Sequence, residues 1–168
     1  FYKGQKINST IEENKIWLNL TGEGKYSQLL VGFLDDATDE FDRLYDGIRL
    51  DSGADININS ILNEISYAIL GKSYLKKEEV IPLGINSKIT GSFKIAIDKL
   101  QGLLIGANVL LIDKETNTSH DLSTGAYSFN ITNSGTYNSR FELHINTKNA
   151  NIPIYNIKNA DIKLYSSA

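Results

Sequence analysis

The 168-residue chain contains no cysteine. It therefore has no disulfides, no thiolate ligands for a metal and no cysteine nucleophile, which excludes disulfide-stapled scaffolds and cysteine-dependent enzymes. Proline is scarce, with two residues, whereas 41% of the residues are hydrophobic. This composition is typical of a folded globular protein and argues against a disordered chain.

A strong charge of one sign is also lacking. The net charge is -3, and the only adjacent pair of basic residues is Lys76 and Lys77. Because nucleic-acid-binding domains usually carry a basic face, we expect no nucleic-acid partner. No apolar run approaches the roughly 18 residues that a membrane-spanning helix needs, so we predict no transmembrane segment.

What the chain does have is a period of two between hydrophobic and polar residues. Phe141, Leu143 and Ile145 alternate with polar residues in 140–146, as in a strand with one buried face. Predicted inward residues of the other alternating segments are Ile16, Leu18 and Leu20; Ile65, Tyr67 and Ile69; Phe93, Ile95 and Ile97; and Tyr127, Phe129 and Ile131. Turn sequences such as TNSG at 132–135 separate the runs. The sequence predicts an all-β fold, an antiparallel and jelly-roll-like β-sandwich.

The organisation along the chain follows from these runs. We expect strands near 15–20, 28–34, 64–70, 79–83, 89–98, 107–113, 118–122, 126–132, 139–146 and 160–165. Residues 1–146 would form the β-sandwich domain. Residues 147–168 are Asn-rich with short apolar couplets. They are interpreted as a linker and the first strand of a following C-terminal β unit, or as terminal strands docked on the same sandwich.

Six acids crowd into residues 31–47, VGFLDDATDEFDRLYDG. One interpretation is a short helix near 38–46. Phe41, Leu44, Tyr45 and Ile48 have the spacing of one helical face. Asp36 or Thr38 would be the N-cap, Asp39 and Glu40 would lie in the first turn, and Gly47 would end the helix in a left-handed conformation.

The alternative interpretation of this stretch is a calcium site. Calcium prefers clustered carboxylates, and the candidate ligands are Asp36, Asp39, Asp42 and Asp46. Their spacing differs from the ladder of an EF-hand loop. Both interpretations remain open, and no other cofactor is expected.

Few residues suggest catalysis. His120 and His144 are the natural acid–base candidates. His144 falls on the outward side of a strand, and His120 is followed by Asp121, which would point to the opposite face. The GEGKY sequence at 22–26 is interpreted as a turn between strands rather than a phosphate-binding loop. We predict that the chain is not an enzyme and assign no catalytic residues.

Trp17 falls on the polar side of its predicted strand, and the chain has nine tyrosines. Exposed aromatics of this kind can stack on sugars, so surface glycans are one candidate partner. The alternative is that a loop covers Trp17, which then contributes to packing.

Several motifs occur together in a recognisable order. IWLNLT at 16–21 is followed by QLLVGFLDDATDEFDRLYDG, then by VIPLG at 80–84 and ITGSFKIAIDKLQGLL at 89–104. The last motif is NVLLIDKETNTSHDLSTGAYSFNITNSGTYNSRFELHI at 108–145, with the core V-x-L-x-D-x-x-T-x-x-x-H-D-L-x-x-G-x-Y-x-F and a closing R-F. In this combination the chain resembles the β domain that adjoins the C-terminal sorting domain of type IX secretion system substrates. The likeness covers roughly residues 14–146.

The resemblance implies a non-enzymatic C-terminal region of a secreted or cell-surface protein that crosses the outer membrane. Its expected role is in secretion or attachment, or as a spacer in an adhesin. The implied partners are the type IX secretion machinery or its outer-membrane shuttle. The sequence at 160–168, ADIKLYSSA, resembles the start of the sandwich that follows this domain in the family. We therefore expect the 168 residues alone to be exported poorly. The runner-up function is a carbohydrate-binding jelly-roll module.

Overall fold

The computed structural model describes residues 13–50 and 53–148. Strands account for 62% and helix for 4% of them, which confirms an all-β fold. The strands are β1 (Asn14–Gly22), β2 (Lys25–Phe33), β3 (Gly47–Ile48), β4 (Ile56–Leu62), β5 (Ile65–Lys72), β6 (Glu78–Ser87), β7 (Gly91–Gln101), β8 (Asn108–Asp113), β9 (Thr118–Asp121), β10 (Tyr127–Ile131) and β11 (Gly135–Asn146). Two short 3-10 helices, η1 (Gly102–Leu104) and η2 (Leu122–Thr124), complete the elements.

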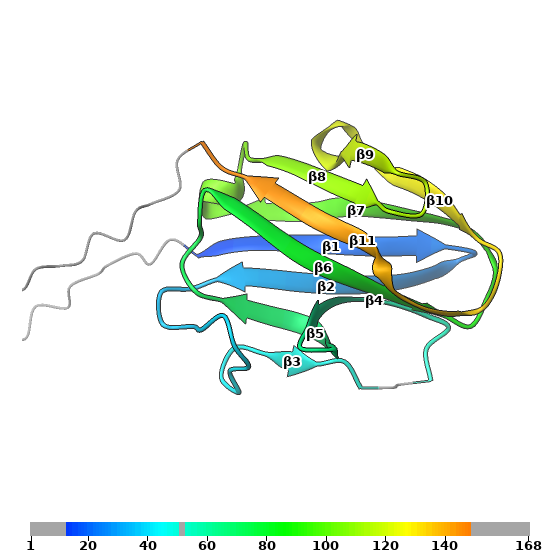
Figure 1. Cartoon of the computed structure of the whole chain (residues 1–168), viewed down its shortest axis with the longest axis horizontal. Coiled ribbons are helices and arrows are strands. Elements are labelled where there is room, and N and C mark those ends of the chain that lie inside the picture. Colours follow the sequence, from blue (N-terminus) through cyan, green and yellow to red (C-terminus); the bar gives the residue numbers. More distant parts are fainter. Residues whose placement is uncertain (1–12, 51–52, 149–168) are drawn as a thin grey trace, which may run out of the picture.

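All the strands belong to one sheet with the order β10-β7-β1-β2-β5-β4-β6-β11-β8-β9, and β3 pairs with β5 off this path. The described strand pairs are antiparallel except β2 with β5, which are parallel. The sheet is thus mixed rather than antiparallel as predicted. It curls until it is nearly closed into a barrel, and in Figure 1 β6 and β11 cross in front of β1 and β2. The finer assignment to a sandwich remains a prediction.

The hydrophobic core fills the space that the curled sheet encloses. The predicted alternation places the inward side chains of β1 and β11 in this core. Ile16, Leu18 and Leu20 of β1 are fully buried, and so are Phe141 and Leu143 of β11. Residues of β2, β4, β6, β7, β8 and β10 join the same cluster. Burial of each such side chain contributes roughly 1.5–3 kcal/mol to folding, before the entropy cost.

The hairpin between β1 and β2 confirms the interpretation of GEGKY as a turn. Glu23 and Gly24 have φ angles of 49° and 71°, the left-handed pair of a tight two-residue hairpin. Next to it, Gly22 lies against β7. A Cβ at Gly22 would come within 2.4 Å of Phe93 Cδ1, so glycine is needed for this close approach.

The inward residues predicted for β5 are partly wrong. Tyr67 is buried, but Ile65 and Ile69 are each 44% exposed. For Ile69 the register along β3 explains the change of side, because Gly47 pairs with Ile69 and Ile48 with Tyr67. Ile65 lies before this irregularity, at the first residue of β5 beside the turn from β4. One step along β3 therefore matches two along β5, and such a bulge shifts the inward side after Tyr67.

The helix predicted near 38–46 is wrong. Residues 34–46, hereafter the acidic loop, join β2 to β3 without an α-helix. One turn with helical hydrogen bonding occurs at 42–46, where the Asp46 N–H donates to the Asp42 carbonyl at 2.8 Å. The Asp42 side chain accepts from the Leu44 N–H at 3.0 Å, and the Asp46 side chain accepts from the Asp42 N–H at 2.7 Å. Bonds of this kind compete with a helix for the backbone donors.

The apolar residues that suggested the helix lie mostly at the surface, although the ring of Phe41 is 6.2 Å from that of the buried Tyr67. Phe41, Leu44 and Ile48 are 48%, 85% and 46% exposed. Asp36 and Thr38 therefore cap no helix, and Thr38 Oγ1 donates instead to the Glu40 carbonyl at 2.9 Å. Gly47 is a residue of β3, without the left-handed conformation predicted for a helix end.

The predicted boundary after residue 146 coincides with the end of β11 at Asn146. The next residue, Thr147, is buried, and its N–H donates to the Lys77 carbonyl at 2.9 Å. Residues 149–168, to which we assigned a linker and a further strand, lie outside the described residues, so the division at 146 remains a prediction. In the described ranges no helix has the length and apolar character to cross a membrane.

Candidate functional site

Asp39 fastens the acidic loop to the connection between β5 and β6. One of its carboxylate oxygens lies 2.7 Å from Lys76 Nζ, and the other accepts from Ser73 Oγ at 2.7 Å. Lys72 Nζ lies 3.6 Å away. Burial acts to raise the pKa of Asp39, but the bonds to Lys76 and Ser73 outweigh it and hold the pKa well below its usual range. Asp39 is thus an ionised anchor at neutral pH.

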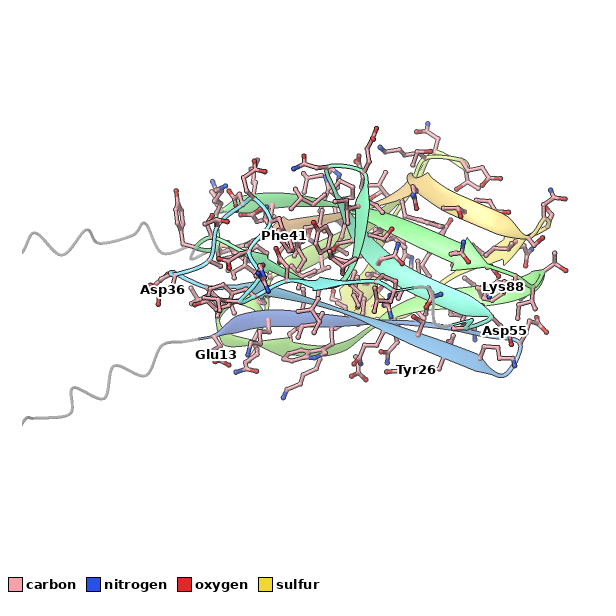
Figure 2. All side chains as sticks on the ribbon, turned by 90° about the horizontal axis from the view of Figure 1, so that it is seen from below. Glu13, Tyr26, Asp36, Phe41, Asp55 and Lys88 are labelled. Atoms are coloured by element: carbon pink, nitrogen blue, oxygen red, sulfur yellow. The ribbon has the colours of Figure 1, made fainter. Side chains whose placement is uncertain are left out.

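The other candidate calcium ligands do not converge on Asp39. Asp46 Oδ1 accepts from the Gly71 N–H at 2.7 Å, which ties the loop to β5, and Asp42 holds the local turn. Asp36 is exposed at the end of the molecule (Figure 2). In the part of the chain that the structure describes, no three His, Asp or Glu side chains gather as metal ligands would. Calcium binding by Asp36, Asp39, Asp42 and Asp46 stays an untested prediction.

The two histidines have separate surroundings. His120 Nε2 lies 3.0 Å from the Gly125 carbonyl, and its ring centre is 5.6 Å from that of Tyr127. Its neighbour Asp121 instead accepts from the Ser123 N–H at 2.9 Å and caps η2. His144 Nε2 lies 3.1 Å from a carboxylate oxygen of Glu142 on the surface. These contacts place neither histidine beside a serine or threonine hydroxyl that could act as a nucleophile.

Asp113 and Arg140 form a buried ion pair near the place where the sheet closes. Asp113 is fully buried and Arg140 is 9% exposed. Arg140 Nε and Nη2 donate to the two Asp113 oxygens at 3.0 and 2.8 Å. The Tyr127 hydroxyl donates to Asp113 at 3.0 Å, and the Glu115 N–H does so at 3.0 Å. Burial acts to raise the pKa of Asp113, but the bonds from Arg140 and Tyr127 keep it below its usual range.

Aromatic rings surround this ion pair. The Arg140 guanidinium lies 5.1 Å from the ring centre of Phe129 and 4.8 Å from that of Phe141, distances at which a cation and a ring attract each other. The two rings are 4.9 Å apart and nearly edge to face. These residues come from β8, β10 and β11 and belong to the V-x-L-x-D to R-F motif. We call them the closure cluster: Asp113, Tyr127, Phe129, Arg140 and Phe141.

Trp17 lies on the outer face of β1, as predicted, and is half-buried. Its cross-strand neighbours are Leu30 of β2 and Lys99 of β7. Lys99 Nζ lies 5.1 Å from the centre of the Trp17 ring system. One side of the tryptophan is therefore covered by a lysine.

A polar network continues along the same outer face. Asn19 Oδ1 accepts from the Tyr26 hydroxyl at 3.0 Å and from Gln28 Nε2 at 2.9 Å. Gln28 Nε2 also lies 3.1 Å from an Asp98 oxygen. The Tyr26 side chain is exposed and points away from the sheet in Figure 2. Together with Trp17 these groups form a surface with two aromatic rings and several hydrogen-bonding groups.

The sequence analysis missed a polar pocket on the outer face of β4, β6 and β11. Its volume is about 490 Å³, within the range of small-molecule sites. The residues that line it are Arg49, Leu50, Asn57, Asn59, Ser66, Asn86, Ser87, Lys88, Ser134, Gly135, Thr136 and Asn138. The available signal was ININS at 56–60, where asparagines alternate with isoleucines. We call this site the amide pocket.

A family model described as a domain of unknown function, DUF8693, matches residues 1–145. The match covers most of the chain and extends from before β1 to Ile145, the residue before the end of β11. No curated protein and no solved structure matches the chain significantly.

Proposed function

The chain belongs to the DUF8693 family, and we propose that it is a non-enzymatic β domain of a secreted or cell-surface protein exported by the type IX secretion system. In this role it serves secretion or attachment, or spaces an adhesin from the cell. Its partners are the secretion machinery or its outer-membrane shuttle. The proposal starts from the order of motifs along the chain.

The observation that carries the proposal is the closure cluster. The last motif of the resemblance contains Asp113, Tyr127 and Arg140, and Asp113 is hydrogen-bonded to both of the others inside the fold. The motif therefore supports the architecture of a compact domain rather than a reaction centre.

Export of a reporter tests this proposal. A fluorescent reporter with a periplasmic signal is fused ahead of the 168 residues, with or without any residues that follow them in the gene. Both fusions are expressed in a host with a type IX system and in the same host lacking it. We expect the longer fusion to reach the medium or cell surface only when the system is present, and the shorter fusion shows whether the 168 residues are sufficient for export.

Two controls make the result interpretable. Asp113→Asn in the longer fusion disturbs the domain and leaves any downstream signal intact. Lower export of this variant, with unchanged periplasmic expression, supports a role for the folded domain. Retention of the longer fusion in both hosts contradicts the proposal. Full export of the shorter fusion would place the export signal within these 168 residues.

We propose carbohydrate binding as a second candidate function. Under this alternative the sheet would form a jelly-roll-like sandwich. The observation that favours it is the outer face of β1 and β2. There Trp17 lies in the same surface as Tyr26, Asn19 and Gln28. An aromatic ring beside amide and hydroxyl groups suits a sugar, which has apolar ring faces and polar edges.

A glycan array separates the two functions. Strong binding that disappears in Trp17→Ala would favour the carbohydrate-binding function. Tyr74→Ala is a matched control, because Tyr74 is an exposed aromatic that lies between β5 and β6. Absence of binding at high protein concentration would contradict this second candidate and leave the export proposal unaffected.

A further inference from the structure

The floor of the amide pocket is a set of cross-strand neighbours on one face of the sheet. Asn57 of β4 pairs with Asn86 of β6, and Asn86 pairs in turn with Thr136 of β11. Asn59 pairs with Gly84. Because paired residues point to the same side of a sheet, this row presents amides and a hydroxyl to the pocket.

Gly84 makes the hollow. A Cβ at this position would lie 2.6 Å from both Asn138 Oδ1 and Asn59 Nδ2. Real Cβ atoms do not approach polar atoms so closely, so a side chain here would push the two asparagines apart. Because Gly84 of β6 has no side chain, the amides of Asn59 on β4 and Asn138 on β11 can both lie close to its backbone.

Several of these amides have hydrogen-bonding capacity to spare. Asn57 is largely buried, yet no side-chain hydrogen bond of Asn57 or Asn138 occurs among the described residues. Asn86 donates to Thr136 Oγ1 at 2.8 Å, which leaves its carbonyl oxygen available. A ligand with several hydroxyl groups would satisfy both the donors and the acceptors.

The charge in the pocket is positive. Arg49 lines one wall, where its Nη2 donates to the backbone carbonyls of Gln28 at 2.8 Å and Ile58 at 2.6 Å. Its Nε is buried without a hydrogen-bond partner. No carboxylate is paired with Arg49 among the described residues, and none lines the pocket. Burial also lowers the pKa of Arg49, consistent with a cation that lacks a counterion.

We propose that the amide pocket binds a sugar unit that carries a carboxylate, such as a uronic acid. The asparagine amides and Thr136 bond the sugar hydroxyls, and Arg49 supplies the positive charge for the carboxylate. The lining offers no aromatic ring for stacking, so recognition rests on hydrogen bonds and charge. This site lies on a different surface from Trp17 and does not depend on the export proposal.

Nuclear magnetic resonance titration of the ¹⁵N-labelled protein tests the proposal, because asparagine side-chain amides give their own signals. Glucuronate and galacturonate are added to millimolar concentrations, with glucose, galactose and acetate as separate arms. We expect saturable shifts of the Asn57, Asn86 and Asn138 amides with a uronate. The neutral sugars and acetate should bind about tenfold more weakly. The neutral sugars lack the carboxylate, and acetate lacks the sugar hydroxyls.

Variants separate the pocket from the rest of the surface. Asn57→Ala and Asn86→Ala should each weaken uronate binding about three- to tenfold, the effect of one lost hydrogen bond. Arg49→Met should remove the preference for the uronate over the neutral sugar. Asn108→Ala is the matched control, because Asn108 is an exposed asparagine of β8 outside the pocket. Trp17→Ala should also leave the affinity unchanged.

Three outcomes would overturn the proposal. One is the absence of shifts at the pocket amides with either uronate. Another is equal binding of uronate and neutral sugar, or of uronate and acetate. The third is unchanged affinity in both Asn57→Ala and Asn86→Ala when their spectra show a folded protein.

Discussion

Asp113→Asn tests whether the closure cluster holds the two ends of the sheet together. The substitution keeps the size of the side chain but removes its negative charge and one of its acceptor oxygens. Asp113 accepts four hydrogen bonds, two of them from Arg140. In the variant the Arg140 cation remains buried, with Glu115 as its remaining carboxylate partner at 2.7 Å.

The magnitude follows from burial. Removal of one partner of a buried ion pair typically costs about 3–5 kcal/mol, because the other charge is left uncompensated. Glu115 is 61% exposed, so it offsets this cost only in part, and we expect a loss of about 3 kcal/mol. Tyr127→Phe removes a single hydrogen bond to the same carboxylate and should cost at most about 3 kcal/mol.

Urea unfolding followed by circular dichroism gives the free energies, in a cycle with Arg140→Met and the double variant. Methionine keeps apolar contact with Phe129 and Phe141 but carries no charge. Because the double variant leaves no unpaired buried charge, its loss should be smaller than the sum of the single losses by about 1–3 kcal/mol.

The pH dependence gives an independent check. The pKa of Asp113 is lowered in the folded state, so its contribution to stability is present above the unfolded pKa of about 4. It is lost as the pH falls through the lower folded value. The stability difference between the wild type and Asp113→Asn should therefore shrink as the pH falls below about 4. Additive single losses, or a cost under about 1 kcal/mol at pH 7, would refute this account of the cluster.

Three further predictions concern the core, the acidic loop and a close approach of strands. Phe141→Ala should lower the free energy of unfolding by about 3–5 kcal/mol in urea, and a neutral result would mean that its ring is not in the core. Asp39→Asn should lower the free energy of unfolding by at most about 1 kcal/mol, because its lysine partners are partly exposed. Asp36→Ala should lower it less, and a chelator should leave the melting temperature unchanged. If added calcium raises that temperature in a concentration-dependent way, the calcium interpretation of the loop is correct. Gly22→Ala should cost about 1–3 kcal/mol by crowding Phe93, and an unchanged midpoint would contradict the close packing there.

The sequence predicts the strands well where a single face is buried. In β1 and β11 the period of two places the hydrophobic residues correctly because each strand has one face on the core. It fails in β5, where a bulge after Tyr67 changes the inward side. A bulge depends on the pairing with β3, a two-residue strand that no local pattern reveals.

The acidic loop shows a different limit. Its spacing fits a helix, but Asp39 and Asp46 bond to Lys76 and to the Gly71 N–H, residues about 25 to 37 positions away. Such tertiary contacts outweigh a weak local preference. The amide pocket was missed for the same reason, because Asn57, Asn86 and Asn138 become neighbours only when three strands pair.

The parallel pair of β2 and β5 also constrains how the chain can be changed. Two parallel strands cannot be joined by a tight turn, so the chain must travel back along the sheet before β5 begins. The acidic loop is the first part of that return path, and Asp39 and Asp46 attach it to the far end of β5 and the residues just beyond. Its length is therefore a requirement of the topology, whereas the identity of its exposed residues is not. An engineer who wished to display a peptide here should find insertions near Asp36 tolerated and deletions between 36 and 46 disruptive.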